Sequence, residues 1–178
     1  MVDPHKQQLL PWDEVEEGLP DRRRVFTVRS DVVRSQKTGK QLTVDRLIAA
    51  DWVNVVCVTD DDKLVLVRQW RFGARAFTLE LPAGLMERDE EPLVAGLREL
   101  REETGYAPPA PDKARVVGSV NPNPAFMRNT CHTVVVAGAA RVSEQNLDPT
   151  EDIEIITVPV ADVDAIIRRG ELNNALSL

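Results

Sequence analysis

The alternation of apolar and polar residues constrains the fold most, because it recurs on both sides of one strongly helical stretch. Segments of strand length are alternating or rich in apolar, β-branched residues. They occupy residues 24–29, 42–48, 52–59, 64–69, 77–81, 114–120, 132–136 and 153–158, and helical patterns fall within 92–104 and 161–169. This order predicts an α+β domain in which a mixed β-sheet is sandwiched between α-helices.

The central helix has clear local signals. Leu93, Leu97 and Leu100 follow helical spacing and form one apolar stripe. The helix is expected to stop at Gly105, because glycine readily adopts the left-handed conformation found at helix C-termini. Gly96 inside the helix costs about 1 kcal/mol relative to alanine, and the sequence offers no reason for it beyond close packing.

The chain of 178 residues is predicted to divide into an N-terminal arm with a hairpin, residues 1–50, and a main domain, residues 51–178. Thr38 and Gly39 form a turn signal between two alternating segments, which favours the hairpin. No internal repeat or low-complexity tract stands out. The length fits roughly one globular domain with an appended arm.

Composition excludes several classes of protein. A formal net charge of −7 argues against nucleic-acid binding, which requires Lys and Arg to neutralise phosphates. Residues 1–10 are polar, so we expect neither a secretory signal nor a membrane span, and we predict a cytoplasmic protein. Cys57 and Cys131 lie in apolar runs and are interpreted as buried thiols, and no close-spaced Cys/His set indicates zinc.

The acidic patch Glu99, Glu102 and Glu103 is the sharpest chemical feature. On a helix these carboxylates crowd one face, at spacings of three and four residues. Two explanations fit the patch taken alone. Arg98 and Arg101 could neutralise a solvated helix face, or the carboxylates could bind a divalent cation together with substrate phosphates.

The wider pattern favours the second explanation. It comprises Gly84, Glu90, Arg98-Glu99-Leu100, Glu102-Glu103 and Gly105-Tyr106. This pattern resembles the signature of the Nudix hydrolase family at every fixed position. Further segments resemble ADP-ribose pyrophosphatases and related nucleotide-sugar hydrolases, namely 69–71, 79–84, 121–124, 151–154 and 170–175.

The resemblance implies a metal site on the helix. Glu99, Glu102 and Glu103 would bind Mg²⁺, with Mn²⁺ as a substitute, and the backbone carbonyl of Ala83 would join them. Gly84 would let the preceding loop fold tightly against the metal.

Catalytic roles also follow from the resemblance. Arg98 is expected to orient the glutamates through an ion pair, for which Glu90 is a candidate partner. Glu151 is our candidate for the base that activates water, in a loop before the last strand. The alternatives are Asp148, Asp152, Glu154 or a glutamate of the helix such as Glu102.

Three residues are predicted to bind the substrate. Arg71 would contact a phosphate, Glu80 the substrate or a metal, and Trp70 a base. Each has a competing interpretation: Arg71 could be a surface residue, Glu80 could pair with Arg75, and Trp70, like Phe26, could pack in the core. His132 sits in an apolar strand and is interpreted as structural.

The expected function is Mg²⁺-dependent hydrolysis of the pyrophosphate bond of a nucleoside diphosphate sugar such as ADP-ribose, giving a nucleoside monophosphate and a sugar phosphate. The alternatives are pyrophosphohydrolysis of nucleoside triphosphates and a catalytically silent nucleotide sensor. By the same resemblance, residues 1–50 would mediate a homodimer. The predicted partners are therefore a small nucleotide-sugar substrate and a second copy of the chain, with no nucleic acid and no membrane.

Overall fold

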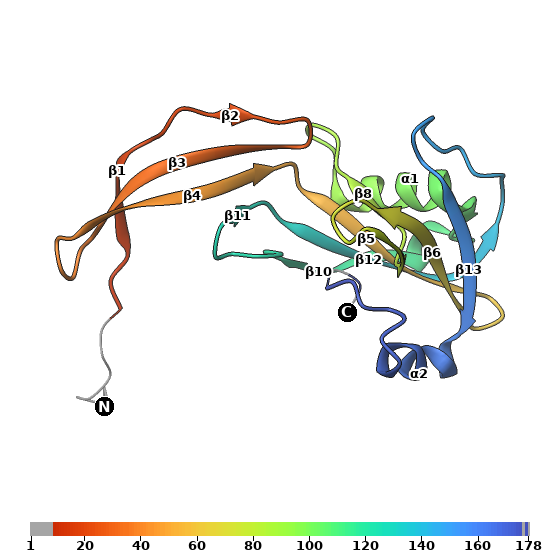
Figure 1. Cartoon of the computed structure of the whole chain (residues 1–178). Helices are drawn as coiled ribbons and strands as arrows, with labels where there is room; N and C mark the ends of the chain where they lie inside the picture. The colour runs from red at the N-terminus through yellow and green to blue at the C-terminus, as the bar shows by residue number, and fades with distance from the viewer. Residues whose placement is uncertain (1–8, 176, 178) are drawn as a thin grey trace. The chain divides into compact units, whose positions relative to one another are not determined.

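A computed structural model of the chain describes residues 9–175 and 177 (Figure 1). The described chain forms two compact units, which we treat separately. The first comprises the described residues up to Ala49 together with Asn123–Arg128, and the second comprises the rest. The segment Asn123–Arg128 was expected in the main domain, but its strand pairs with a strand of the first unit.

The first unit is a sheet built on a hairpin. Its strands are β1 (Trp12–Glu16), β2 (Asp21–Arg22), β3 (Phe26–Ser35), β4 (Gln41–Ala49) and β11 (Met127–Arg128). The order is β1-β3-β4-β11, and β2 pairs with β3. The predicted hairpin is confirmed as β3 and β4, joined by a turn in which Gly39 has a φ of 70°. The arm predicted before it contains an unexpected strand, because β1 pairs with β3 along the sheet edge.

The first unit also buries one carboxylate among arginines. Asp31 on β3 is 1% exposed and forms ion pairs with Arg29 at 2.8 Å and Arg46 at 3.1 Å. Its Oδ1 accepts a hydrogen bond from the backbone N–H of Gly18 at 2.9 Å. Burial alone would raise the pKa of Asp31, but these bonds and the arginine charges outweigh it and lower the pKa.

The second unit contains a mixed sheet. Its main strands follow the order β10-β12-β5-β6-β13, in which β12 runs parallel to β5 and the other pairs are antiparallel. They span β10 (Ala114–Val120), β12 (Cys131–Arg141), β5 (Trp52–Thr59), β6 (Lys63–Arg71) and β13 (Ile153–Pro159). Three shorter strands extend it, β7 (Ala76–Glu80) beside β6, β8 (Ala83–Leu85) beside β5 and β9 (Tyr106–Ala107) beside β12.

Two α-helices cover this sheet, α1 (Pro92–Thr104) and α2 (Val163–Arg168), with short 3-10 turns at Pro111–Lys113 and Val160–Asp162. Alternate residues of β5 point to opposite faces. Val55 packs in one cluster with Leu100 of α1, whereas Val56 packs in another with Ile166 of α2. Full burial of a Val, Leu or Ile side chain contributes roughly 1.5–3 kcal/mol to the stability of the folded state. The predicted sheet between helices is therefore confirmed.

Close contacts explain Gly96 within α1 and Gly105 directly after it. A Cβ on Gly96 would lie 2.7 Å from Cγ2 of the buried Val134 on β12, so only glycine allows α1 to approach the sheet this closely. Gly105 ends the helix in the left-handed conformation, with a φ of 72°, and a Cβ there would lie 2.0 Å from the carbonyl oxygen of Ser143.

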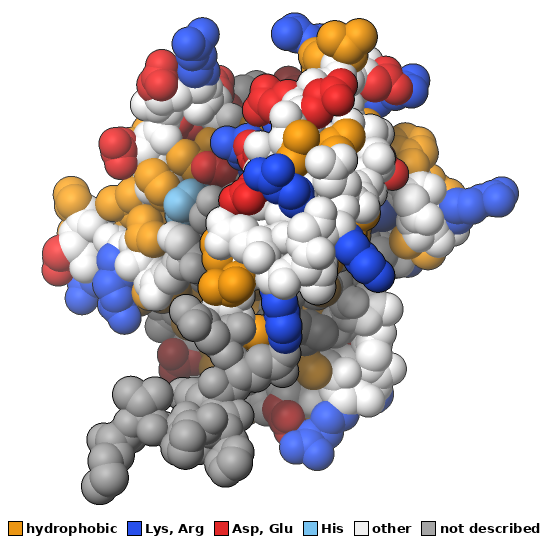
Figure 2. Space-filling model, turned by 90° about the vertical axis from the view of Figure 1, so that its left-hand side faces the viewer, with side chains coloured by type: hydrophobic (Ala, Val, Ile, Leu, Met, Phe, Trp, Pro, Cys, Tyr) orange, Lys and Arg blue, Asp and Glu red, His pale blue; other side chains and the backbone are white. Residues whose placement is uncertain are grey.

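Further predictions from the sequence concern burial. Cys57 and Cys131 are free, buried thiols as expected, and burial raises the pKa of Cys57 to about 12. None of the described helices is long and apolar enough to span a membrane. Figure 2 shows exposed hydrophobic side chains in several separate groups among charged ones on the face it displays.

Candidate active site

A tight loop places the acidic face of α1 against strand β8. The strand pairs with β5 through Val53 and Gly84, and the chain then turns into α1 at Pro92. A Cβ on Gly84 would lie 2.1 Å from the carboxyl carbon of Glu99. The glycine predicted to allow a tight loop therefore leaves room for a carboxylate of the helix.

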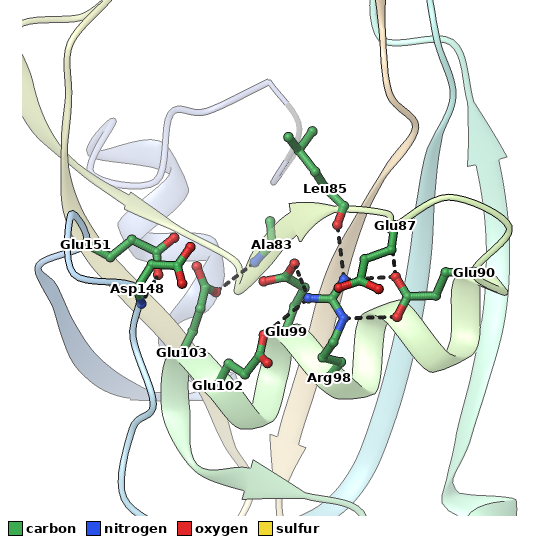
Figure 3. A network of polar contacts seen from close by, with 10 residues as sticks. All are labelled: Ala83, Leu85, Glu87, Glu90, Arg98, Glu99, Glu102, Glu103, Asp148 and Glu151. Atoms are coloured by element: carbon green, nitrogen blue, oxygen red, sulfur yellow. Dashed lines mark hydrogen bonds and ion pairs between the residues drawn. The ribbon is translucent and has the colours of Figure 1, made fainter. Parts of the chain in front are cut away.

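Arg98 is the centre of a hydrogen-bond network on this face (Figure 3). Its Nε and Nη2 each donate to Glu90 at 2.9 Å, and Nη1 donates to Glu99 at 2.8 Å and to Glu102 at 3.2 Å. Nη2 also donates to the carbonyl of Leu85 at 3.1 Å. Hydrogen bonding with Glu90 is the main reason that the pKa of Arg98 is raised and that of Glu90 lowered. The expected ion pair with Glu90 is present.

Glu103 is the carboxylate that this network leaves without a cationic partner. It is 4% exposed, and its Oε2 accepts a hydrogen bond from the backbone N–H of Ala83 at 2.9 Å. Burial raises its pKa to about 8. The hydrogen bond from Ala83 and the charge of Arg71 oppose this rise, and the charges of Glu99 and Glu151 add to it. The pKa of Glu99 is also raised, mainly by burial. Negative charge therefore exceeds positive charge at this end of α1.

A divalent cation fits this excess of carboxylates. Hard cations prefer oxygen ligands, and Glu99, Glu102 and Glu103 lie on adjacent positions of one helix face. Across residues 9–175 and 177, no three Asp, Glu, His or Cys side chains lie close enough to hold one metal ion in the positions shown. Convergence on an ion would therefore require side-chain rotation, for which Glu102 has freedom since 40% of its side chain is exposed.

The loop between β12 and β13 brings a further carboxylate to the same end of α1. Figure 3 shows Glu151 and Asp148 on the side of the helix where Glu103 lies. The backbone N–H of Glu151 donates to the carbonyl of Asp148 at 2.9 Å, and that of Asp148 donates to Glu151 Oε2 at 3.2 Å. The charge of Glu151 contributes to the raised pKa of both Glu99 and Glu103. Glu151 therefore adds to the negative charge near the acidic face.

The three other carboxylates named as alternative bases lie in or beside the same loop. Glu154 lies on β13 and pairs with Arg68 at 3.4 Å, with 63% of its side chain exposed. Asp152 is exposed in the loop. The backbone carbonyl of Asp148 accepts a hydrogen bond from the N–H of Glu151, and its side chain lies beside Glu151 on the side of α1 that carries Glu103 (Figure 3).

Two of the predicted substrate-binding residues contact each other. Arg71 donates from Nε to Glu80 Oε1 at 2.8 Å and from Nη2 to Oε2 at 2.7 Å. Glu80 is 2% exposed and also accepts hydrogen bonds from Thr78 and Asn174. Burial alone would raise the pKa of Glu80, but these bonds lower it. The alternative interpretation paired Glu80 with Arg75, but the arginine that bonds both of its carboxylate oxygens is Arg71.

Glu80 therefore anchors Arg71, whose side chain is 44% exposed. The partners Thr78 and Asn174 were missed by sequence reasoning, since no local pattern links Asn174 to a strand nearly a hundred residues earlier. Trp70 is 44% exposed and makes an edge-to-face contact with Phe77, with ring centroids 5.4 Å apart. Trp70 is therefore not a core residue.

The fold and the acidic helix together define a class of protein. Comparison with known proteins identifies the family. A family model described as NUDIX domain matches residues 50–176, which is most of the chain. The chain therefore belongs to the NUDIX family. A solved structure of ADP compounds hydrolase has the same fold, with a TM-score of 0.83 at 22% identity over 97% of this chain and 91% of that one.

The chain is also similar in sequence to two curated relatives. The chain is 32% identical over 124 residues to the ADP-ribose pyrophosphatase of Bacillus subtilis (strain 168), across 69% of this chain and 65% of that protein. It is 34% identical over 140 residues to the ADP-sugar pyrophosphatase of Mus musculus, across 73% of this chain and 62% of that protein. The matches thus span less than two thirds of these relatives.

Proposed function

We propose that the protein hydrolyses the pyrophosphate bond of a nucleoside diphosphate sugar, with ADP-ribose as the leading candidate. The products would be a nucleoside monophosphate and a sugar phosphate. The names of two relatives support the substrate class. The observation that carries the proposal is the excess of carboxylates at one end of α1, where the buried Glu103 has a raised pKa and Arg98 is already shared by three glutamates.

Mg²⁺, with Mn²⁺ as a substitute, would balance this charge, and Glu99, Glu102, Glu103 and the carbonyl of Ala83 would hold it. When bound, it offsets the charge of the diphosphate and lowers the pKa of water. Arg98 keeps Glu99 and Glu102 oriented through the hydrogen bonds at 2.8 and 3.2 Å. This guanidinium does not titrate in the working range, so the orientation persists at neutral pH.

Other residues contact the substrate and the water. Arg71, locked in a two-bond contact with Glu80, presents a fixed guanidinium to a phosphate oxygen. Glu151 accepts a proton from the attacking water at its carboxylate. Trp70, half exposed beside Phe77, offers an aromatic face to the base.

We further propose that the protein is a homodimer formed through its first unit. This unit exposes large hydrophobic side chains, including Trp12 (48%), Val15 (46%) and Leu19 (92%). Sedimentation velocity at micromolar concentration tests the proposal, and a monomer at the highest concentration would contradict it. The cytoplasmic location stays a prediction.

Product analysis tests the proposed reaction. Purified protein is incubated with Mg²⁺ or Mn²⁺ and a panel of nucleoside diphosphate sugars and nucleoside triphosphates, and the products are separated by chromatography. A nucleoside monophosphate with a sugar phosphate supports the proposal, whereas release of pyrophosphate from triphosphates would assign the triphosphate reaction instead. Water labelled with ¹⁸O shows which phosphorus is attacked.

Two variants complete this experiment. Glu102→Gln should reduce turnover by roughly a hundredfold or more, because it removes a charge from the metal site. Glu91→Gln is the matched control, since Glu91 is an exposed neighbour at the start of the same helix and makes no side-chain cap. If no panel member is hydrolysed while a known enzyme is active in the same buffer, the proposed reaction is wrong.

A further inference from the structure

One side chain joins α1 to the loop that carries Glu151. The amide nitrogen of Gln145 donates to the carbonyl of Glu103, on α1, at 2.7 Å and to the carbonyl of Ile153, at the start of β13, at 3.1 Å. Both hydrogens of one amide group are thus used to connect two elements. Gln145 is partly buried, so these bonds have little competition from water.

Backbone hydrogen bonds surround this bridge. The last carbonyl groups of a helix have no partner within it and must find one elsewhere. Here the N–H of Asn146 donates to the carbonyl of Glu102 at 2.8 Å, and the N–H of Val142 donates to that of Gly105 at 2.8 Å. The segment 142–146 therefore caps the C-terminal end of α1, which is also the end that presents Glu102 and Glu103.

The far side of the loop is fixed by the same amide. Ile153 is 6% exposed and pairs with Gln69 in the sheet, so its carbonyl is a rigid anchor. The residues between the two anchors, 147–152, include Glu151 and Asp148. Within the described residues, the side chain of Gln145 joins the carbonyl of Glu103 at the end of α1 to the carbonyl of Ile153 at the start of β13.

We propose that Gln145 is a positioning residue that sets the place of Glu151 relative to the carboxylates of α1. The inference rests on the proposed function, in which Glu151 acts on the attacking water. A displacement of about 1 Å in a catalytic group can cost up to a hundredfold in rate. Loss of the bridge removes the side-chain link between the two ends of the loop, while the backbone bonds of Asn146 and the sheet pairing of Ile153 remain, so Glu151 samples positions away from the reacting water.

The test compares Gln145→Met with Glu144→Gln. Methionine keeps the length of the side chain but donates no hydrogen bond. Glu144 is the adjacent residue and forms an exposed ion pair with Arg141 at 2.7 Å, so its variant controls for a change in the same loop. We expect Gln145→Met to lower kcat roughly tenfold with KM within about twofold, and Glu144→Gln to change neither by more than about twofold.

A double variant separates positioning from general stabilisation. In the Glu151→Gln background, Gln145→Met should lower kcat by less than about twofold further, because its effect acts through Glu151. An equal loss in both backgrounds, or an unchanged kcat in Gln145→Met, would overturn the inference.

Amide hydrogen exchange gives a readout that does not depend on turnover. Residues 147–152 should exchange faster in Gln145→Met than in Glu144→Gln, while the amides of β5 and β12 stay unchanged. Equal exchange in the two variants would overturn the inference even if the wild-type protein hydrolyses no substrate. Failure of the proposed function would instead appear as an inactive wild-type protein.

Discussion

Two buried carboxylates in the two units have opposite surroundings. Asp31 in the first unit lies between Arg29 and Arg46 and accepts a backbone hydrogen bond, and its pKa is lowered. Glu103 in the second unit accepts one backbone hydrogen bond near other carboxylates, and its pKa is raised to about 8. The two side chains are 1% and 4% exposed, so burial does not distinguish them.

The two carboxylates differ in the number of cationic side chains around them. A carboxylate with two arginines is electrically satisfied, and its charge helps to hold the sheet together. A carboxylate surrounded by others is costly unless a cation arrives from outside. Perturbed pKa values of this second kind are typical of functional sites. The comparison fits a structural role for Asp31 and the proposed cation-binding role for Glu103.

The largest effect is expected from a change that disturbs only the unsatisfied cluster. Gly84→Ala places a methyl group where the carboxylate of Glu99 lies, 2.1 Å from its carboxyl carbon. The flexible glutamate should swing away, so hydrolysis falls roughly a hundredfold while the fold survives. Gly118→Ala is the control, because its Cβ would meet nothing within 4 Å. Steady-state kinetics and a thermal melt measure both, and near-normal activity in Gly84→Ala would remove Glu99 from the site.

The next effect concerns the satisfied carboxylate. Asp31→Asn removes the charge that two arginines share and should weaken the first unit by about 2 kcal/mol, seen as roughly thirtyfold faster hydrogen exchange in β3 and β4. The lowered pKa of Asp31 means that its stabilisation is present above the ordinary value of 3.8 and is lost as pH falls through the folded-state pKa. An effect that persists undiminished at pH 2 would contradict the assignment.

Glu103→Gln should have the opposite effect on stability: at pH 8 it should stabilise the metal-free protein. The raised pKa means that the folded, metal-free protein binds a proton that the unfolded chain releases, so stability falls as pH rises from 4.5 to about 8. In EDTA, the glutamine variant should melt about 4 °C above wild type at pH 8 and equal to it near pH 4.5. Differential scanning calorimetry across this range decides the point. A variant less stable than wild type at pH 8 would show that Glu103 is satisfied after all.

The smallest effect tests whether α1 can retreat from the sheet and so relieve the crowding of its acidic face. Gly96→Ala should gain helix propensity but press a methyl group to 2.7 Å from Val134, a buried side chain with little rotational freedom. We expect a net loss of about 1 kcal/mol in urea unfolding. In a Val134→Ala background, Gly96→Ala should cost little further stability, because the methyl group it meets is gone. A stabilised Gly96→Ala would mean that the helix can move.

The elements with strong local patterns could be predicted from the amino-acid sequence. The long strands, α1 with its apolar stripe and Gly105 stop, and the buried thiols were all predictable, because periodicity and residue type act over a few neighbours. The spacing from Gly84 to Tyr106 also sufficed to indicate the family, since it lies within one loop and one helix.

The contacts between residues far apart in the chain could not be predicted in this way. Strand β1, the pairing of β11 with β4, the contact of Glu80 with Arg71 and Asn174, and the bridge made by Gln145 leave no periodic trace in the sequence. Such contacts depend on how strands are ordered in a sheet and how loops return to a helix end. Hydrogen bonds and charge balance are set by that long-range packing, so the opposite environments of Asp31 and Glu103 emerge only when the chain has folded.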